Sequence, residues 1–173
     1  DRGRGLTSLG RALVRACNEL GILIDVSHLN DAGFWDVLEY STKPVVASHS
    51  NCRALCPVAR NLSDEQILAL AKKGGLIGIN FHVGFLRAGA ERPEDVRLDD
   101  VIAHIDHIVE LAGVDHVGFG SDFDGATMPA DLADAAHLPR LLETLARRGY
   151  DETALRKICR ENWLRVIRAV WRE

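Results

Sequence analysis

Short apolar segments alternate with amphipathic segments along this chain, and this alternation constrains the fold more than any other feature. Runs of β-branched and other apolar residues predict four strands, at 22–28, 43–49, 76–81 and 116–123. Capping residues and helical periodicity predict six helices, at 7–21, 30–40, 62–74, 98–113, 134–148 and 151–171. Strands that alternate with helices are typical of right-handed crossovers and a parallel sheet, so we expect an α/β fold.

Composition excludes several classes of protein. The 173 residues, 47% of them hydrophobic, suit one domain with a sizeable core. A net charge of -4 without a basic stripe argues against nucleic-acid binding. No apolar run approaches the roughly 20 residues of a membrane helix. No glycine-rich phosphate loop follows a strand, which disfavours a nucleotide-binding sheet.

The start of the chain, D-R-G-R-G-L-T, reads as the interior of a longer protein. No secretory signal is visible, so the compartment stays open, with the cytoplasm as the expectation. Irregular spacing of the four cysteines predicts reduced, mostly buried thiols. A zinc knuckle of His49, Cys52 and Cys56 is disfavoured, because three residues separate the cysteines and no second pair follows.

Polar residues stand at the end of each predicted strand. His28 ends the first strand, His49 the second, Asn80 and His82 the third, and Asp122 the fourth. In parallel barrels that edge carries the catalytic residues. Two-residue alternation predicts that each strand has an inner row leading to its polar end. The predicted rows are Ile22, Ile24, Val26 and His28; Val45, Ala47 and His49; and Gly118, Gly120 and Asp122.

Each of these residues also has a structural interpretation. A lone histidine after a strand is more often a hydrogen-bonded loop residue than a ligand, but two Ser-His pairs at matching strand ends make metal binding equally reasonable. Asp122 is a candidate for acid–base work or a turn residue. Arg60 is solvated by default. Four further histidines are expected to be surface or structural residues: His104, His107, His116 and His137.

Several motifs, in order, resemble the membrane (renal-type) dipeptidases, the zinc dipeptidases of the amidohydrolase superfamily. They are I-D-V-S-H, V-V-A-S-H-S, A-R-N-L-S-D-E-Q, G-I-N-F and G-F-G-S-D-F-D-G, with G-L-T-S-L-G near the start and E-N-W-L-R-V near the end. The resemblance covers essentially the whole chain. It implies that the full-length protein hydrolyses dipeptides with two zinc ions.

The resemblance also assigns roles to individual residues. It implies that His28 and His49 bind one zinc ion and that Asp122 is the catalytic aspartate, which also contacts the substrate. Arg60 would receive the C-terminal carboxylate of the dipeptide. Asn80 and His82 are further candidates for substrate contact, although the family often has Tyr at the position of His82.

The remaining family ligands are expected upstream of this chain. They are a His-x-Asp pair, a glutamate that bridges both metals, and a histidine that faces the substrate carbonyl. A (β/α)8 barrel typically needs about 250 residues, and the sequence predicts only four strands. We therefore expect residues 1–173 to form a single partial domain, the second half of a TIM-like barrel: strands five to eight and the terminal helices.

Two other functions remain open from sequence. One is another metal-dependent hydrolase or deaminase of the same superfamily, which would not need Arg60. The other is a pseudo-enzyme or binding module. Beyond the dipeptide substrate the resemblance allows a homodimer, while nucleic acid and membrane segments are not expected. Alone, the 173-residue chain should be inactive, because two histidines are too few for a zinc site.

Overall fold

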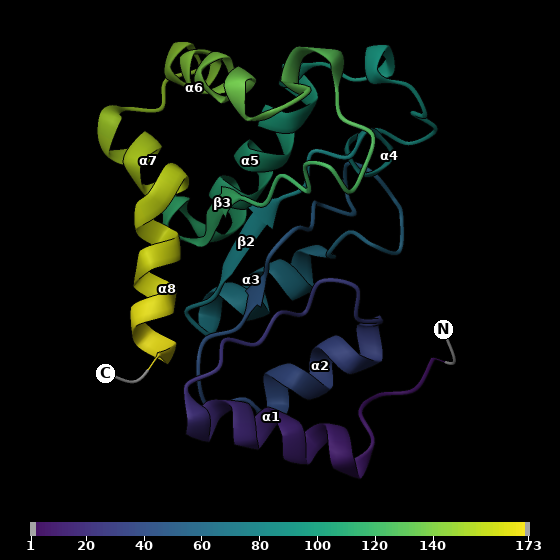
Figure 1. The fold of residues 1–173 in the computed structure, drawn as a ribbon, viewed down its shortest axis with the longest axis vertical. Helices are drawn as coiled ribbons and strands as arrows, with labels where there is room; N and C mark the ends of the chain where they lie inside the picture. The colour runs from purple at the N-terminus through teal and green to yellow at the C-terminus, as the bar shows by residue number, and fades with distance from the viewer. Residues whose placement is uncertain (1–2, 172–173) are drawn as a thin grey trace.

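A computed structural model describes residues 3–171 and shows a small parallel sheet packed between helices (Figure 1). The ends of the predicted domain 1–173, residues 1–2 and 172–173, lie outside the described residues. The strands are β1 (Val46–Ala47), β2 (Leu76–Ile79) and β3 (Val117–Phe119), in the order β1-β2-β3. Both pairings are parallel, which confirms the predicted α/β class.

No strand forms over the predicted range 22–28, and the strands predicted at 43–49, 76–81 and 116–123 are all shorter in the structure. Only one bridge, between Asp25 and Val46, joins the segment 22–28 to β1. The Val26 N–H donates to the Val46 carbonyl at 2.8 Å, and the Val46 N–H donates to the Ile24 carbonyl at 3.0 Å. The chain then turns, because the Leu29 N–H bonds back to the carbonyl of Val26 at 3.1 Å. The prediction of a strand over 22–28 is therefore wrong, because the segment forms one bridge and then turns after Val26.

The helices lie within the predicted ranges, except that a short helix at 83–86 was not predicted and that the range 151–171, predicted as one helix, contains two. They are α1 (Ser8–Leu20), α2 (Asp31–Tyr40), α3 (Asp64–Lys72), α4 (Val83–Leu86), α5 (Leu98–Ala112), α6 (Leu138–Arg147), α7 (Glu152–Arg156) and α8 (Asn162–Val170). A π-helical turn, Lys157–Glu161, joins α7 to α8, and 3-10 turns lie at Pro93–Asp95, Val114–His116, Ala130–Leu132 and Ala135–His137. None of the described helices is long and apolar enough to cross a bilayer.

Polar side chains cap the first three helices. The Thr7 hydroxyl accepts from the Gly10 N–H at 3.1 Å, and the Asn30 side chain accepts from the Gly33 N–H at 2.7 Å. Ser63 and Gln66 form a reciprocal capping box at the start of α3. Such caps stabilise a helix by about 1 kcal/mol each, so the helix starts are fixed locally.

The two faces of the sheet pack against different helices. Val45 and Ala47 belong to the main core, which contains apolar residues of α2, α3 and α5, whereas Val46 and Leu76 pack with α8. Because neighbouring residues of a strand point to opposite faces, Val45 and Ala47 face the helices α2, α3 and α5. The prediction that they form an inner row with His49 is therefore wrong. Ile24 and Val26 also lie in the main core.

Glycines on β2 and β3 allow the sheet to close tightly beside Ser48. A Cβ at Gly78 or at Gly120 would overlap the Ser48 carbonyl oxygen, and one at Gly118 would lie 2.9 Å from the Trp163 indole nitrogen. A side chain at any of these three positions would collide with backbone or indole atoms, so the close approach requires glycine. These glycines let the end of β1 lie against the ends of β2 and β3.

His104 on α5 is a structural histidine. Its exposed fraction is 1%. Nδ1 accepts from the Cys52 N–H at 3.1 Å, and Nε2 lies 3.0 Å from the Leu86 carbonyl oxygen. A backbone N–H only donates, so Nδ1 is the acceptor and Nε2 carries the proton. Burial lowers the pKa of His104, and the Leu86 contact opposes that shift.

This lowered pKa predicts an acid-dependent loss of stability. Above about pH 6.5 His104 is neutral in both states, but below it the unfolded chain takes up a proton that folded His104 resists. We expect His104→Gln, which cannot titrate, to flatten the fall in unfolding free energy below pH 6.5. The difference is at most about 1.4 kcal/mol per pH unit. Urea titrations between pH 7.5 and 5 measure it, with the surface variant His137→Gln as control; parallel curves for wild type and His104→Gln would refute it.

Candidate metal and catalytic site

Two turns at the ends of neighbouring extended segments bring His28 and His49 together. Their Nε2 atoms lie 2.8 Å apart, and the ring centroids are 4.9 Å apart. His28 has a φ of 69°, in the left-handed region that non-glycine residues rarely adopt. Such backbone strain is concentrated at functional sites. The geometry therefore brings together the two histidines selected from sequence.

The histidine pair fits part of a zinc site. Imidazole nitrogens are suitable zinc ligands, and at Zn–N distances of about 2.0–2.1 Å a tetrahedral ion would hold them about 3.3 Å apart. The pair would need to open by only about 0.5 Å from its present contact. Among residues 3–171, however, no group of three or more His, Cys, Asp or Glu side chains is placed to hold a metal. Two ligands are too few for a zinc site.

The sequence contains one His-x-Asp triplet, at 104–106, and the structure shows that it is no ligand pair. Both ring nitrogens of His104 contact backbone groups, as described above. Asp106 accepts hydrogen bonds from Tyr150 at 2.8 Å and Arg148 at 3.2 Å. The triplet lies within α5 and is structural.

Asp122 follows β3 and is held by a buried amide. It also has a left-handed φ, 63°. The Nδ2 of Asn80 donates to Asp122 Oδ2 at 3.1 Å. Asn80 is fully buried, and its N–H donates to the Asn51 side chain at 2.9 Å. Asn80 was a candidate for substrate contact, but its observed contact is with Asp122.

Arg60 lies beside the same strand ends. Its Nη2 donates to the His49 carbonyl at 3.3 Å, and its guanidinium stacks over the Phe85 ring at 5.3 Å. Nε is buried and has no hydrogen-bond partner among the described residues. Burial lowers the pKa of Arg60, and the charges of Asp122 and Asp25 oppose that shift. Arg60 is therefore held in place with donor capacity to spare, unlike the solvated default.

Electrostatics join these groups into one cluster. Burial lowers the pKa of His49, while Asp122 and Asp25 raise it and Arg60 and His28 lower it further. Histidine is neutral when it binds a metal. The net downward shift of the His49 pKa thus favours the binding form at neutral pH.

His82 lies at the margin of the cluster. Its Nδ1 is 3.1 Å from the Thr127 carbonyl oxygen, and its ring meets the Phe85 ring edge-on with centroids 4.6 Å apart. Phe85 also carries the Arg60 guanidinium. His82 therefore connects to the site through Phe85.

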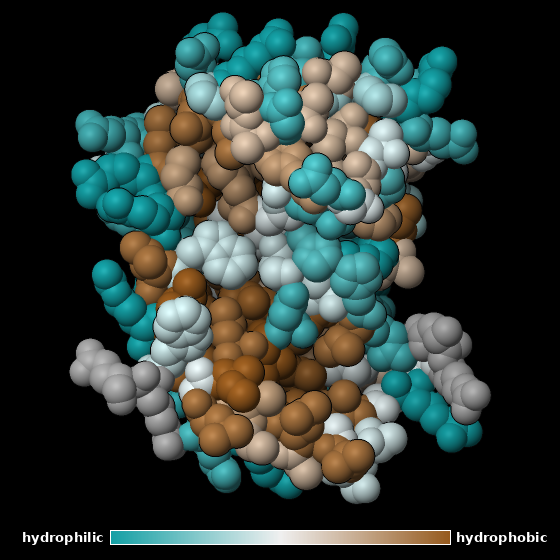
Figure 2. All heavy atoms as spheres, viewed as in Figure 1, coloured by the Kyte–Doolittle hydropathy of each residue, from teal (hydrophilic) through white to brown (hydrophobic). Residues whose placement is uncertain are grey.

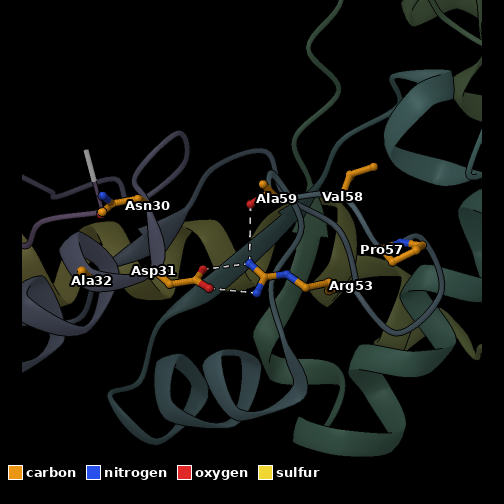
Figure 3. A pocket seen from close by; sticks show the side chains of 8 residues that line it. Asn30, Asp31, Ala32, Arg53, Pro57, Val58 and Ala59 are labelled. Carbon is orange, nitrogen blue, oxygen red and sulfur yellow. Dashed lines mark hydrogen bonds and ion pairs between the residues drawn. The ribbon is translucent and has the colours of Figure 1, made fainter. Parts of the chain in front are cut away.

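Two adjoining pockets open beside the loop that follows His28. One is lined by His28, Leu29 and Arg60 among others. In the other, drawn in Figure 3, two lining residues, Asp31 and Arg53, form a bidentate pair at 2.8 and 2.9 Å. Hydrogen bonding from Arg53 lowers the pKa of Asp31. Arg53 is therefore already paired, whereas the pocket beside it contains His28 and Arg60, two of the residues selected from sequence.

Sequence reasoning missed two residues at this site, Asp25 and Ser48. Asp25 contacts Ser48, and Ser48 contacts the His49 ring. Both residues belong to the motifs I-D-V-S-H and V-A-S-H, but the two-residue alternation within a strand does not predict a contact between them. The four cysteines are free in the structure, but only Cys52 and Cys56 are buried, whereas Cys17 is half-buried and Cys159 is exposed. The prediction of mostly buried thiols is therefore met by two of the four.

Comparisons with known proteins match the entire chain. A family model described as membrane dipeptidase (peptidase family M19) matches residues 1–172. A Klebsiella pneumoniae protein described only as an uncharacterized protein in the pqqA 5′ region is 48% identical over 173 residues, which are 100% of this chain and 64% of the relative.

Solved structures give the same match. A dipeptidase described as a metallopeptidase of family M19 is 46% identical with a TM-score of 0.95 over 99% of this chain and 51% of its own. A Rhodobacter sphaeroides metallopeptidase, solved with a phosphinate mimic of the dipeptide L-Ala-D-Ala, has the same identity and TM-score over 99% of this chain and 49% of its own. An amidohydrolase from Pseudomonas aeruginosa is 30% identical with a TM-score of 0.89, over 100% of this chain and 60% of its own. The chain thus spans about half the length of the two most similar of these structures.

Proposed function

This chain belongs to the membrane dipeptidase family, peptidase family M19, and from that membership we propose that it supplies one half of a zinc dipeptidase site. In this proposal residues 1–173 are the second half of a TIM-like barrel, strands five to eight with the terminal helices. The parallel order of the extended segment 24–26 and β1, β2 and β3 supports it. So does the match to about half of two solved relatives.

The main support for this proposal is that His28, His49, Asp122 and Arg60 lie close together at the carboxyl ends of the strands. His28 and His49 would hold one zinc ion through Nε2, with the remaining ligands on the other half of the barrel. When bound, zinc supplies an activated water and polarises the peptide carbonyl.

Asp122 would move the proton in this reaction. Its carboxylate lies at the carboxyl end of β3, where a general base is expected in a barrel. Asn80 holds one carboxylate oxygen, which leaves the other to take the proton from the attacking water and deliver it to the leaving amine. Asn80 would thus act by orienting Asp122.

Arg60 would bind the free carboxylate of the dipeptide. Its stacking on Phe85 and its bond to the His49 carbonyl fix the guanidinium plane. A fixed fork of donors matches a carboxylate. This clamp would restrict substrates to short peptides with a free C-terminus. His82, which packs against Phe85, would lie beside the bound peptide.

Replacing Arg60 tests the clamp. We expect Arg60→Ala in the full-length protein to raise KM about 10- to 100-fold with a smaller change in kcat, since a hydrogen-bonded charge contributes about 1.5–3 kcal/mol. Steady-state kinetics with L-Ala-D-Ala measure it, and Arg53→Lys, in the neighbouring ion pair, is the matched control. A dipeptide amide, which lacks the carboxylate, should be hydrolysed equally poorly by wild type and Arg60→Ala. An unchanged KM for the free dipeptide would rule out the clamp.

A substrate panel tests the function as a whole. Full-length protein loaded with zinc should hydrolyse L-Ala-D-Ala or L-Ala-L-Ala, and should lose that activity after chelation. Activity only on cyclic amides or nucleobases would favour a different amidohydrolase, a reading to which the likeness to the Pseudomonas aeruginosa amidohydrolase gives some weight. A protein that hydrolyses none of these substrates, with or without zinc, would favour a pseudo-enzyme.

A further inference from the structure

We infer that Asp25 and Ser48 are positioning residues that hold the His49 ring in the tautomer able to bind zinc through Nε2. They do so through a chain of hydrogen bonds, Asp25 to Ser48 to His49. This inference rests on the proposed zinc-binding role of His49 and adds two residues that act through the His49 ring.

Asp25 is the end of this series of hydrogen bonds that the backbone holds in place. Its Oδ1 accepts from the backbone N–H groups of Ser27 and Ser48, both at 2.9 Å. These bonds tie the turn that carries His28 to the turn that carries His49. Asp25 lies at the exposed edge of the sheet, so bonding rather than burial sets its orientation. Its Oδ2 is thereby directed at the Ser48 hydroxyl, 2.5 Å away.

Counting the protons along these hydrogen bonds then gives the tautomer of the His49 ring. An ionised carboxylate only accepts, so the Ser48 hydroxyl donates its one proton to Asp25. Ser48 Oγ lies 2.6 Å from His49 Nδ1, and with its proton committed it must accept there. Nδ1 of His49 therefore carries the ring proton, and Nε2 keeps its lone pair.

The freed Nε2 faces the other histidine. The Nε2 atom of His28 lies 2.8 Å from it. The same lone pair is the one that zinc needs. Metal-binding histidines generally have their second nitrogen held by such a partner, and loss of that partner costs about 10- to 100-fold in metal affinity.

Asp25→Asn separates this role from a structural one. The amide oxygen still accepts from both backbone N–H groups, so the link between the two turns is preserved. Its Nδ2, however, donates to Ser48 Oγ, which turns the hydroxyl proton toward His49 Nδ1. The ring proton then moves to Nε2, the wrong atom for zinc. Ser48→Ala removes the bond to the ring without imposing the wrong tautomer.

The test uses full-length protein and two measurements other than activity. The first is the zinc dissociation constant from competition with a chromophoric chelator. We expect it to rise about 10- to 100-fold in Asp25→Asn and less in Ser48→Ala. The matched control is Ser50→Ala, which removes the hydroxyl of a buried serine that contacts Ser27 rather than the His49 ring and should bind zinc like wild type.

The second measurement is the tautomer of His49 in metal-free protein, from its ring 15N shifts. Protonated Nδ1 in wild type and protonated Nε2 in Asp25→Asn are expected. Unchanged zinc affinity and an unchanged tautomer in Asp25→Asn would overturn the inference while leaving the proposed function intact. If Asp25→Asn does not fold, equal zinc affinities for Ser48→Ala and Ser50→Ala overturn it. Wild-type protein that binds no zinc would instead overturn the proposed function.

Discussion

Asp122→Asn in the full-length protein is expected to abolish measurable dipeptide hydrolysis while zinc content stays near that of wild type. General acid–base catalysis typically contributes about 10²- to 10⁴-fold, and an amide cannot take a proton from water at neutral pH. The substitution should leave the local structure unchanged. Asn tolerates the left-handed backbone at this position, and its amide oxygen can still accept from Asn80, the contact seen in the structure.

The control for this variant lies two residues away. Asp124 has the same left-handed backbone, with a φ of 64°, and is exposed. Asp124→Asn should therefore keep wild-type kcat and KM. Zinc is measured by atomic absorption and turnover with L-Ala-D-Ala. Full activity of Asp122→Asn would remove its catalytic role, whereas loss of zinc along with activity would point to a role in holding the metal.

The second large effect concerns the 173-residue chain by itself. We expect it to show no dipeptidase activity, to bind zinc weakly and to self-associate. Only two of the proposed metal ligands lie among the described residues, and neither belongs to a group of three candidate ligands. A zinc site with fewer than three protein ligands is not expected to hold the ion.

Its surface explains the expected self-association. The extended segment 24–26 pairs with β1, and its other edge has no strand partner among residues 3–171. Figure 2 shows hydrophobic side chains gathered over α1 and the region between α1 and the sheet. Leu9, Leu13 and Leu20 of α1 and the nearby Ile22 are at least half exposed. Open edges and apolar patches of this kind favour association.

Size-exclusion chromatography with light scattering, zinc titration and a dipeptide assay test this expectation together. The control is the full-length protein of the proposal, which should be monodisperse, bind zinc and hydrolyse the substrate. A monomeric, zinc-loaded and active 173-residue chain would contradict both the half-barrel and the incomplete site.

Local sequence determined the helices and the position of the site. The helix starts depend on contacts between residues that are three positions apart, which involve Thr7, Asn30 and the Ser63–Gln66 capping box. Such local contacts can be predicted from the sequence around each helix start. The polar ends of the strands likewise follow from the point where each apolar run stops. Their ordered motifs were enough to identify the family.

Tertiary structure decided which way the site residues face and what holds them. Two-residue alternation placed Val45 and Ala47 in a row with His49, but the chain leaves the extended conformation at Ser48 and His28, where alternation no longer applies. The bonds that orient His49 and Asp122 join residues distant in sequence, Asp25 to Ser48 and Asn80 to Asp122. Such contacts depend on the register of neighbouring strands, which is set by packing across the whole sheet. The sequence therefore named His28, His49, Asp122 and Arg60, and only the fold revealed the residues that position them.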